Sequence, residues 1–226
     1  MTRRREAGGG GIVVEVEPDR VEGWFARFAG RNDGVISTVI TTDDVVVTGG
    51  DGTTATAKVP FPPLAGEGRF EGLAIEPLAA HVRMPRTVGI LLVRLGGHSV
   101  GIAEQGRIVA SRTDRHHVHG RNAAGGWSQQ RFARRRQGQA RQALRAAAED
   151  AAEVLGSRLS ELDGVVLGGD RRALDELRAE SRLAPLFAKA ESRVLDVAEP
   201  RRVVLDEAAV RALSVEIVVR KGEAPR

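Results

Sequence analysis

The hydrophobic and polar positions in the first third of the chain follow the short period of β-strands. Apolar runs separated by Gly, Asp and Pro clusters predict strands at residues 12–17, 35–40, 44–48 and 53–59. Residues 20–29 differ, because their apolar side chains recur at helical spacing and predict a short helix with one apolar face, formed by Val21, Trp24, Phe25 and Phe28. A connector with glycines and prolines follows, to about residue 85. We therefore expect a small α/β region with its linker at residues 12–85.

From residue 87 the pattern becomes a meander of strands followed by alternating helices and strands. The meander consists of predicted strands at 88–95, 98–104 and 107–112, and residues 114–120 are compatible with a further strand. The longest helical pattern runs from a Ser128 cap to about residue 155 and is weakened at Gly138. Shorter elements follow, with strands at 164–167, 193–197 and 215–220 and helices at 171–178 and 206–213. This order predicts a mixed α/β layer fold over residues 86–222.

The first eleven residues show neither the helical nor the strand period. They contain three arginines and four consecutive glycines, and the apolar stretch of a signal peptide is missing, so we expect residues 1–11 to be a disordered tail. No apolar run in the sequence approaches the ~18–20 residues of a membrane span. The sequence has no cysteine, which excludes disulfides, thiolate metal sites and cysteine nucleophiles. These features lead us to expect a cytoplasmic protein.

Charge is distributed unevenly along the sequence. The formal net charge is only +4, but the window 112–145 holds nine arginines and one acidic residue, Asp114. That window carries +8, so the rest of the chain is acidic by four charges. A basic block on an otherwise acidic protein indicates a local surface for a polyanion.

The basic block has the order of a strand, a glycine loop and a basic helix start. The N-terminus of a helix offers free backbone N–H groups and positive partial charge, both of which suit phosphate. Arg131, Arg134 and Arg135 lie within the first two turns of the predicted helix. Trp127 can stack on a base, as aromatic residues do in RNA-binding sites. Together these residues predict contact with nucleic acid.

At these residues the chain resembles a known family. The similar parts are Val118-His119-Gly120-Arg121, the segment Gly125-Gly126-Trp127-Ser128-Gln129-Gln130-Arg131-Phe132, the arginine run after it and the preceding hairpin at 88–112. They resemble the actinobacterial branch of the Vms-like release factors, which are peptidyl-tRNA hydrolases. The resemblance covers most of residues 86–222. It implies the ribonuclease-H-like fold of the middle domain of eukaryotic and archaeal release factors.

The resemblance also implies a mechanism and partners. In those release factors a Gly-Gly-Gln loop enters the peptidyl transferase centre, where the glutamine positions water against the ester between peptide and tRNA. By this resemblance Gln129 or Gln130 is catalytic, and the loop consists of Gly125, Gly126, Trp127 and Ser128. Here Trp127 and Ser128 separate the glycines from the glutamines, so both glutamines are candidates. The implied partners are the acceptor end of peptidyl-tRNA and the large ribosomal subunit, with no metal or cofactor, and the implied RNA-binding residues are Arg121, Arg131, Arg134, Arg135 and Arg136.

Other interpretations use the same residues. His117 and His119 have the spacing of metal ligands on one strand face, but no carboxylate cluster lies near them in the sequence. A two-metal nuclease needs several converging carboxylates, and the hairpin at 88–112 offers only Glu104. The alternatives to ester hydrolysis are therefore metal-independent cleavage of the tRNA acceptor end and a non-catalytic ribosome- or RNA-binding module. Gly168-Gly169-Asp170 lacks the pattern of a nucleotide loop, and we interpret it as a strand-to-helix turn capped by Asp170.

Overall fold

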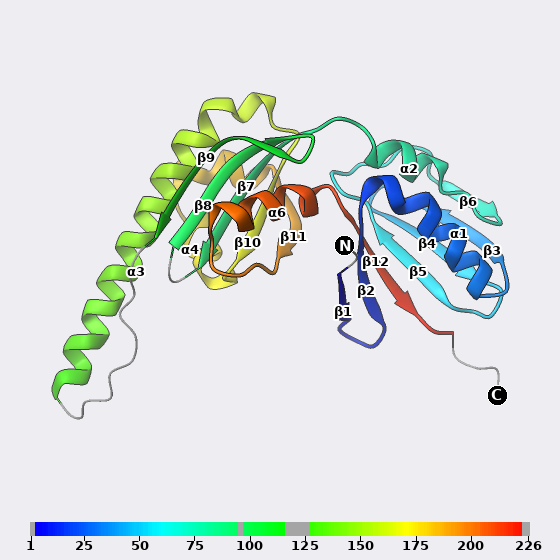
Figure 1. The fold of residues 1–226 in the computed structure, drawn as a ribbon, viewed down its shortest axis with the longest axis horizontal. Helices are drawn as coiled ribbons and strands as arrows, with labels where there is room; N and C mark the ends of the chain where they lie inside the picture. Colours follow the sequence, from blue (N-terminus) through cyan, green and yellow to red (C-terminus); the bar gives the residue numbers. More distant parts are fainter. Residues whose placement is uncertain (1–2, 95–96, 116–126, 223–226) are drawn as a thin grey trace. The chain divides into compact units, whose positions relative to one another are not determined.

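The computed structural model describes residues 3–94, 97–115 and 127–222, and for Arg115 and residues 127–137 it describes the backbone alone (Figure 1). The chain folds into two compact units. The first consists of residues 1–85 together with 210–226, and the second of residues 86–209. The second unit is thus inserted into the chain of the first.

The first unit is an antiparallel sheet covered by two helices. Its strand order is β1-β2-β12-β5-β4-β3-β6, and every neighbouring pair is antiparallel. The strands are β1 (Arg4–Glu6), β2 (Ile12–Val16), β3 (Val35–Ile40), β4 (Asp44–Gly49), β5 (Thr54–Lys58), β6 (Gly68–Glu71) and β12 (Val215–Arg220), and the helices are α1 (Val21–Arg31) and α2 (Glu76–Val82). Alternate residues such as Val45 and Val47 face one core with Phe25 of α1 and Leu78 of α2, as a sheet with one covered face requires.

The second unit is a mixed five-stranded sheet. Its order is β11-β10-β7-β8-β9, where β8 is antiparallel to both neighbours and β10 is parallel to β7 and β11. The strands are β7 (Thr87–Arg94), β8 (Gly97–Glu104), β9 (Arg107–Arg115), β10 (Gly164–Gly169) and β11 (Ala190–Leu195). The first strand of this unit, β7, is central, the second, β8, is antiparallel to it, and the fourth, β10, is parallel to it. This is the ribonuclease-H-like arrangement of strands, so the predicted mixed α/β fold is confirmed.

Helices pack on both faces of the second sheet. They are α3 (Trp127–Val154), α4 (Arg171–Arg178), α5 (Ala184–Ala188) and α6 (Arg202–Ala212). Ala147, Ala148 and Ala151 of α3 are fully buried against β8, and such small side chains let the helix approach closely. On the opposite face Leu205 of α6 lies so near Gly101 that an added Cβ there would be 3.0 Å from Leu205 Cδ2. The strands β7, β8 and β10 are therefore buried on both sides, which explains the apolar runs of β7 and β10, whereas the edge strand β9 is largely exposed.

Most predicted elements are confirmed, and the differences have physical causes. Residues 1–11 were expected to be a disordered tail, but Arg4–Glu6 form β1, whose exposed side chains leave no apolar signal. The connector before residue 85 contains β6 and α2, which are too short for a clear period. The second domain was expected to extend to residue 222, whereas β12 pairs with β2 and β5 in the first unit. No helix among the described residues is long and apolar enough to cross a membrane.

Candidate active site

The candidate catalytic segment connects β9 to α3. Arg121, Gly125 and Gly126 lie outside the described residues, as do His116, His117 and His119. The backbone of α3 begins at Trp127, one residue before the predicted cap, so Ser128, Gln129 and Gln130 belong to its first turn. The predicted RNA-binding residues Arg131, Arg134, Arg135 and Arg136 follow on the same helix, and their side chains lie outside the described part. The first turn of a helix has backbone N–H groups without intrahelical partners, which can donate to a ligand.

A network of polar and charged side chains connects the C-terminal half of α3 to the two strands beside it. His98 of β8 is buried, and its Nε2 lies 2.7 Å from Oδ2 of Asp150 on α3. Nη1 of Arg112 on β9 donates to Oδ1 of Asp150 at 2.9 Å, and its two terminal nitrogens also bind both carboxylate oxygens of Glu153. β9 and α3 are the elements on either side of the candidate loop, so this network joins the strand before the loop to the C-terminal half of the helix after it.

Protonation of Asp150 is coupled to this network. Burial raises the pKa of Asp150, but hydrogen bonds with His98 and Arg112 outweigh it, so the pKa of this carboxyl lies below its ordinary value. The bonds to Glu153 and Asp150 raise the pKa of Arg112, which is charged at all relevant pH values. Ionised Asp150 therefore accepts two charge-assisted hydrogen bonds at neutral pH.

Replacing Asp150 by Asn is expected to lower the free energy of unfolding of the second unit by about 1–3 kcal/mol at pH 7, because bonds to a charged acceptor are lost. A carboxyl whose pKa is depressed by folding stabilises the protein above its unfolded pKa of about 3.9, and loses that contribution as pH falls through the folded pKa. The deficit of the variant should therefore shrink in acid. Urea unfolding at pH 7 and in a series down to pH 3 measures it.

The matched control is Glu149→Gln, which removes the same charge from the neighbouring exposed position of α3. It should change stability by no more than about 0.5 kcal/mol. Equal losses for both variants, or a deficit for Asp150→Asn that does not depend on pH, would contradict the assigned role of Asp150.

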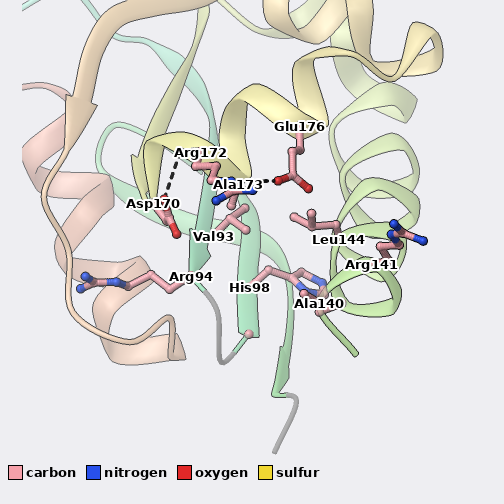
Figure 2. A pocket seen from close by; sticks show the side chains of 12 residues that line it. Val93, Arg94, His98, Ala140, Arg141, Leu144, Asp170, Arg172, Ala173 and Glu176 are labelled. Carbon is pink, nitrogen blue, oxygen red and sulfur yellow. Dashed lines mark hydrogen bonds and ion pairs between the residues drawn. The ribbon is translucent and has the colours of Figure 1, made fainter. Parts of the chain in front are cut away.

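A pocket of about 380 Å³ lies between α3 and α4, at the end of the second sheet (Figure 2). It is lined by the end of β7, the start of β8, the middle of α3 and the start of α4; the residues are Val93, Arg94, Gly97, His98, Ala140, Arg141, Ala143, Leu144, Asp170, Arg172, Ala173 and Glu176. Asp170 caps α4, because its Oδ1 accepts from the backbone N–H of Arg172 at 3.0 Å. That cap confirms the sequence interpretation of Asp170, but no local sequence pattern indicated the pocket.

The alternative metal sites find no support in the described part of the chain. Among those residues no group of three or more His, Cys, Asp or Glu side chains is placed to hold a metal ion. Glu104, the one carboxylate of the first hairpin, is instead 2.9 Å from Nη2 of Arg158 in an ion pair. The histidines at 116, 117 and 119 lie outside the described residues.

Comparison with known protein families gives one match. Residues 86–218 match the sequence model of acVLRF1, described as the Actinobacteria/chloroflexi VLRF1 release factor. No curated protein sequence matches the chain.

Three solved structures are similar to the chain at low identity. They are the archaeal translation termination factor aRF1 (16% identity, 74% of this chain and 48% of that chain, TM-score 0.43), S. cerevisiae Dom34 (9%, 94% and 69%, 0.34) and Archaeoglobus fulgidus Pelota (9%, 93% and 66%, 0.33). The chain spans about half the length of aRF1.

Proposed function

Because the chain belongs to the Actinobacteria and Chloroflexi VLRF1 release factor family, we propose that it hydrolyses the ester bond between a nascent peptide and its tRNA on the large ribosomal subunit. The observation that carries this proposal is the family match over residues 86–218, which includes the segment between β9 and α3 and both candidate glutamines. The charge distribution supports the same partners, since the +8 window at 112–145 surrounds that segment.

The proposed chemistry needs a positioned water and a donor for the developing oxyanion. Water attacks the carbonyl carbon of the peptide ester, the bond to the ribose oxygen breaks, and the tRNA leaves with its hydroxyl restored. The amide of Gln129 or Gln130 holds the water, and a backbone N–H of the first turn of α3 is suited to donate to the oxyanion. A neutral amide needs no shifted pKa, so this mechanism does not depend on a buried acid or base near the loop.

The packing of α3 supports such positioning. The fully buried alanines of its C-terminal half and the pairs of Asp150 with His98 and Arg112 hold the helix against β8 and β9. These contacts anchor the C-terminal half of α3, and its first turn lies ~30–40 Å further along the helix at ~1.5 Å per residue. In this proposal α3 carries the catalytic turn at its free end and is held to the sheet by its other half.

The test is incubation of the protein with peptidyl-tRNA on purified large subunits, with analysis of both products. Free peptide and intact tRNA support ester hydrolysis. Peptide that carries terminal nucleotides means that the protein cleaves the tRNA acceptor end, and unchanged substrate with retained binding means that it is a non-catalytic ribosome-binding module. Either of these two results overturns the proposal.

The arginines of α3 give a separate prediction about binding. Changing Arg134, Arg135 and Arg136 to Ala should weaken binding to tRNA and to large subunits, and should flatten the dependence of affinity on salt, because phosphate contacts release counterions. The slope of log affinity against log salt should fall by up to about 3 if each arginine contacts one phosphate. The control is the triple change of Arg171, Arg178 and Arg182, which removes equal charge from α4 and the turn after it. An unchanged slope in the α3 variant would remove these arginines from the interface.

A further inference from the structure

The pocket between α3 and α4 lies where the strand order of the second sheet reverses. From the central strand β7, the chain adds β8 and β9 on one side and, after α3, β10 and β11 on the other. Val93 and Arg94 end β7 and Asp170 follows β10, and both are parallel strands that reach this edge with their carboxyl ends. In open α/β sheets ligands bind outside the carboxyl ends of strands at such a reversal point.

The charged residues of the pocket offer donors to an anion. In Figure 2 the side chains of Arg94 and Arg141 extend outward on opposite sides of the pocket, and the guanidinium of Arg172 lies between them, beside Glu176. The side chain of Arg172 is 89% exposed and lies 3.4 Å from Glu176, a surface ion pair that contributes little and leaves most of the guanidinium for a ligand. Arg94 donates to the carbonyl of Val197 at 2.6 Å, which fixes its place beside the pocket. Arginine is the usual partner of phosphate because its planar fork matches the phosphate oxygens.

The other lining residues indicate what the anion is attached to. Val93, Ala140, Leu144 and Ala173 form an apolar wall suited to the flat face of a base. The carboxylates of Asp170 and Glu176 would repel a bare anion, but they accept hydrogen bonds from ribose hydroxyls, as acidic residues do in nucleotide sites. A cavity of about 380 Å³ is at the small end of the ~300–1,000 Å³ range of ligand pockets.

We propose that this pocket binds one ribonucleotide, with its phosphate at Arg172, its ribose at the carboxylates and its base on the apolar wall. The ribonucleotide is either a free nucleoside phosphate or an unpaired nucleotide of an RNA chain. The site is separate from the candidate catalytic turn, because residues 140–144 lie ~20–25 Å along α3 from its first residue at ~1.5 Å per residue. The proposal goes beyond the proposed function and does not depend on it.

The experiment measures binding to the full chain without ribosomes, by calorimetry and by amide chemical shifts. The probes are adenosine 5′-monophosphate, its 2′-deoxy analogue, adenosine, inorganic phosphate and single-stranded tetraadenylate. We expect the monophosphate to bind more tightly than the deoxy analogue, adenosine or phosphate, and to shift amides of β7, α3 and α4. Tighter, salt-dependent binding of tetraadenylate identifies an RNA nucleotide as the ligand, and equal or weaker binding identifies a free nucleotide.

Two pairs of variants locate the site. Arg172→Ala should weaken monophosphate binding about tenfold, whereas Arg171→Ala, an exposed neighbour that does not line the pocket, should not. Ala140→Leu should abolish binding by filling the cavity, and Gln142→Leu on the exposed side of α3 should not. The proposal is overturned if no nucleotide binds, if phosphate alone binds as tightly as the monophosphate, or if each variant and its control behave alike.

Discussion

Release of peptide from large subunits should fall about 10²–10³-fold when Gln129 and Gln130 are both changed to Ala, while binding to the subunits stays nearly unchanged. The glutamine amide is proposed to act on the transition state, so its loss should lower the rate of the catalytic step and leave docking intact. Single-turnover release with saturating enzyme measures that rate, and cosedimentation measures binding. The single variants then identify the residue that acts, since neighbouring residues of a helix point about 100° apart.

The control is the double change of Gln139 and Gln142 to Ala, two glutamines in the middle of the same helix. It should leave the release rate within about twofold, because helix propensity barely changes. Full activity of the Gln129 and Gln130 double variant would rule out the glutamine mechanism. His117, His119 and Arg121 would then be the next candidates, as general acid–base groups acting on RNA.

Gly169→Ala should destabilise the second unit by about 3 kcal/mol or more. Gly169 ends β10 at φ +103°, in a region that other residues rarely adopt, and an added Cβ would lie 2.0 Å from the carbonyl oxygen of Val93. The same carbonyl accepts the backbone N–H of Asp170 at 2.8 Å, so the backbone cannot move away without breaking that bond. Hydrogen exchange of β7 and β10 measures the loss, and the β4–β5 hairpin of the first unit is the internal reference.

Gly138→Ala is the opposite case. Gly138 is exposed within α3, and nothing lies within 4 Å of an added Cβ. Alanine there should stabilise the helix by about 0.5–1 kcal/mol because it has less conformational freedom to lose. A Gly169→Ala variant with wild-type exchange, or a Gly138→Ala variant that loosens the helix, would contradict the backbone conformations described.

Sequence patterns were sufficient to predict a helix or strand where a local interaction determines its position. The start of α4 follows from its cap, because the side chain of Asp170 accepts a hydrogen bond from the N–H of Arg172. The amphipathic spacing of the next residues then indicates the length of the helix. The run Val215–Arg220 was equally plain as a strand, but its partners are not encoded nearby: they lie some 200 residues earlier in β2 and 160 earlier in β5. Pairing over such distances is decided by packing, which a local pattern cannot show.

The candidate site likewise has parts that the sequence predicted and parts that it did not. A family resemblance at residues 118–132 pointed to the release factors, and the family match over residues 86–218 confirms that assignment. The catalytic role of the glutamines stays a prediction. The pocket was missed because it is formed by residues from three distant parts of the chain, near 94, 141 and 172, each of which is ordinary in its own sequence context. The Asp150 network was missed for the same reason, because His98, Arg112 and Asp150 come together only when α3 packs on β8 and β9.

The place of β12 has a consequence for the order in which the protein forms during its own synthesis. The second unit ends near residue 209, so its sheet has all five strands before β12 has been made. The first unit is the earlier in sequence, yet until residues 215–220 emerge its β1–β2 hairpin has no strand to join it to β5. The later unit therefore matures first. A growing chain of this protein therefore has an unfinished amino-terminal sheet, with β2 and β5 unpaired on one edge each, until β12 is made.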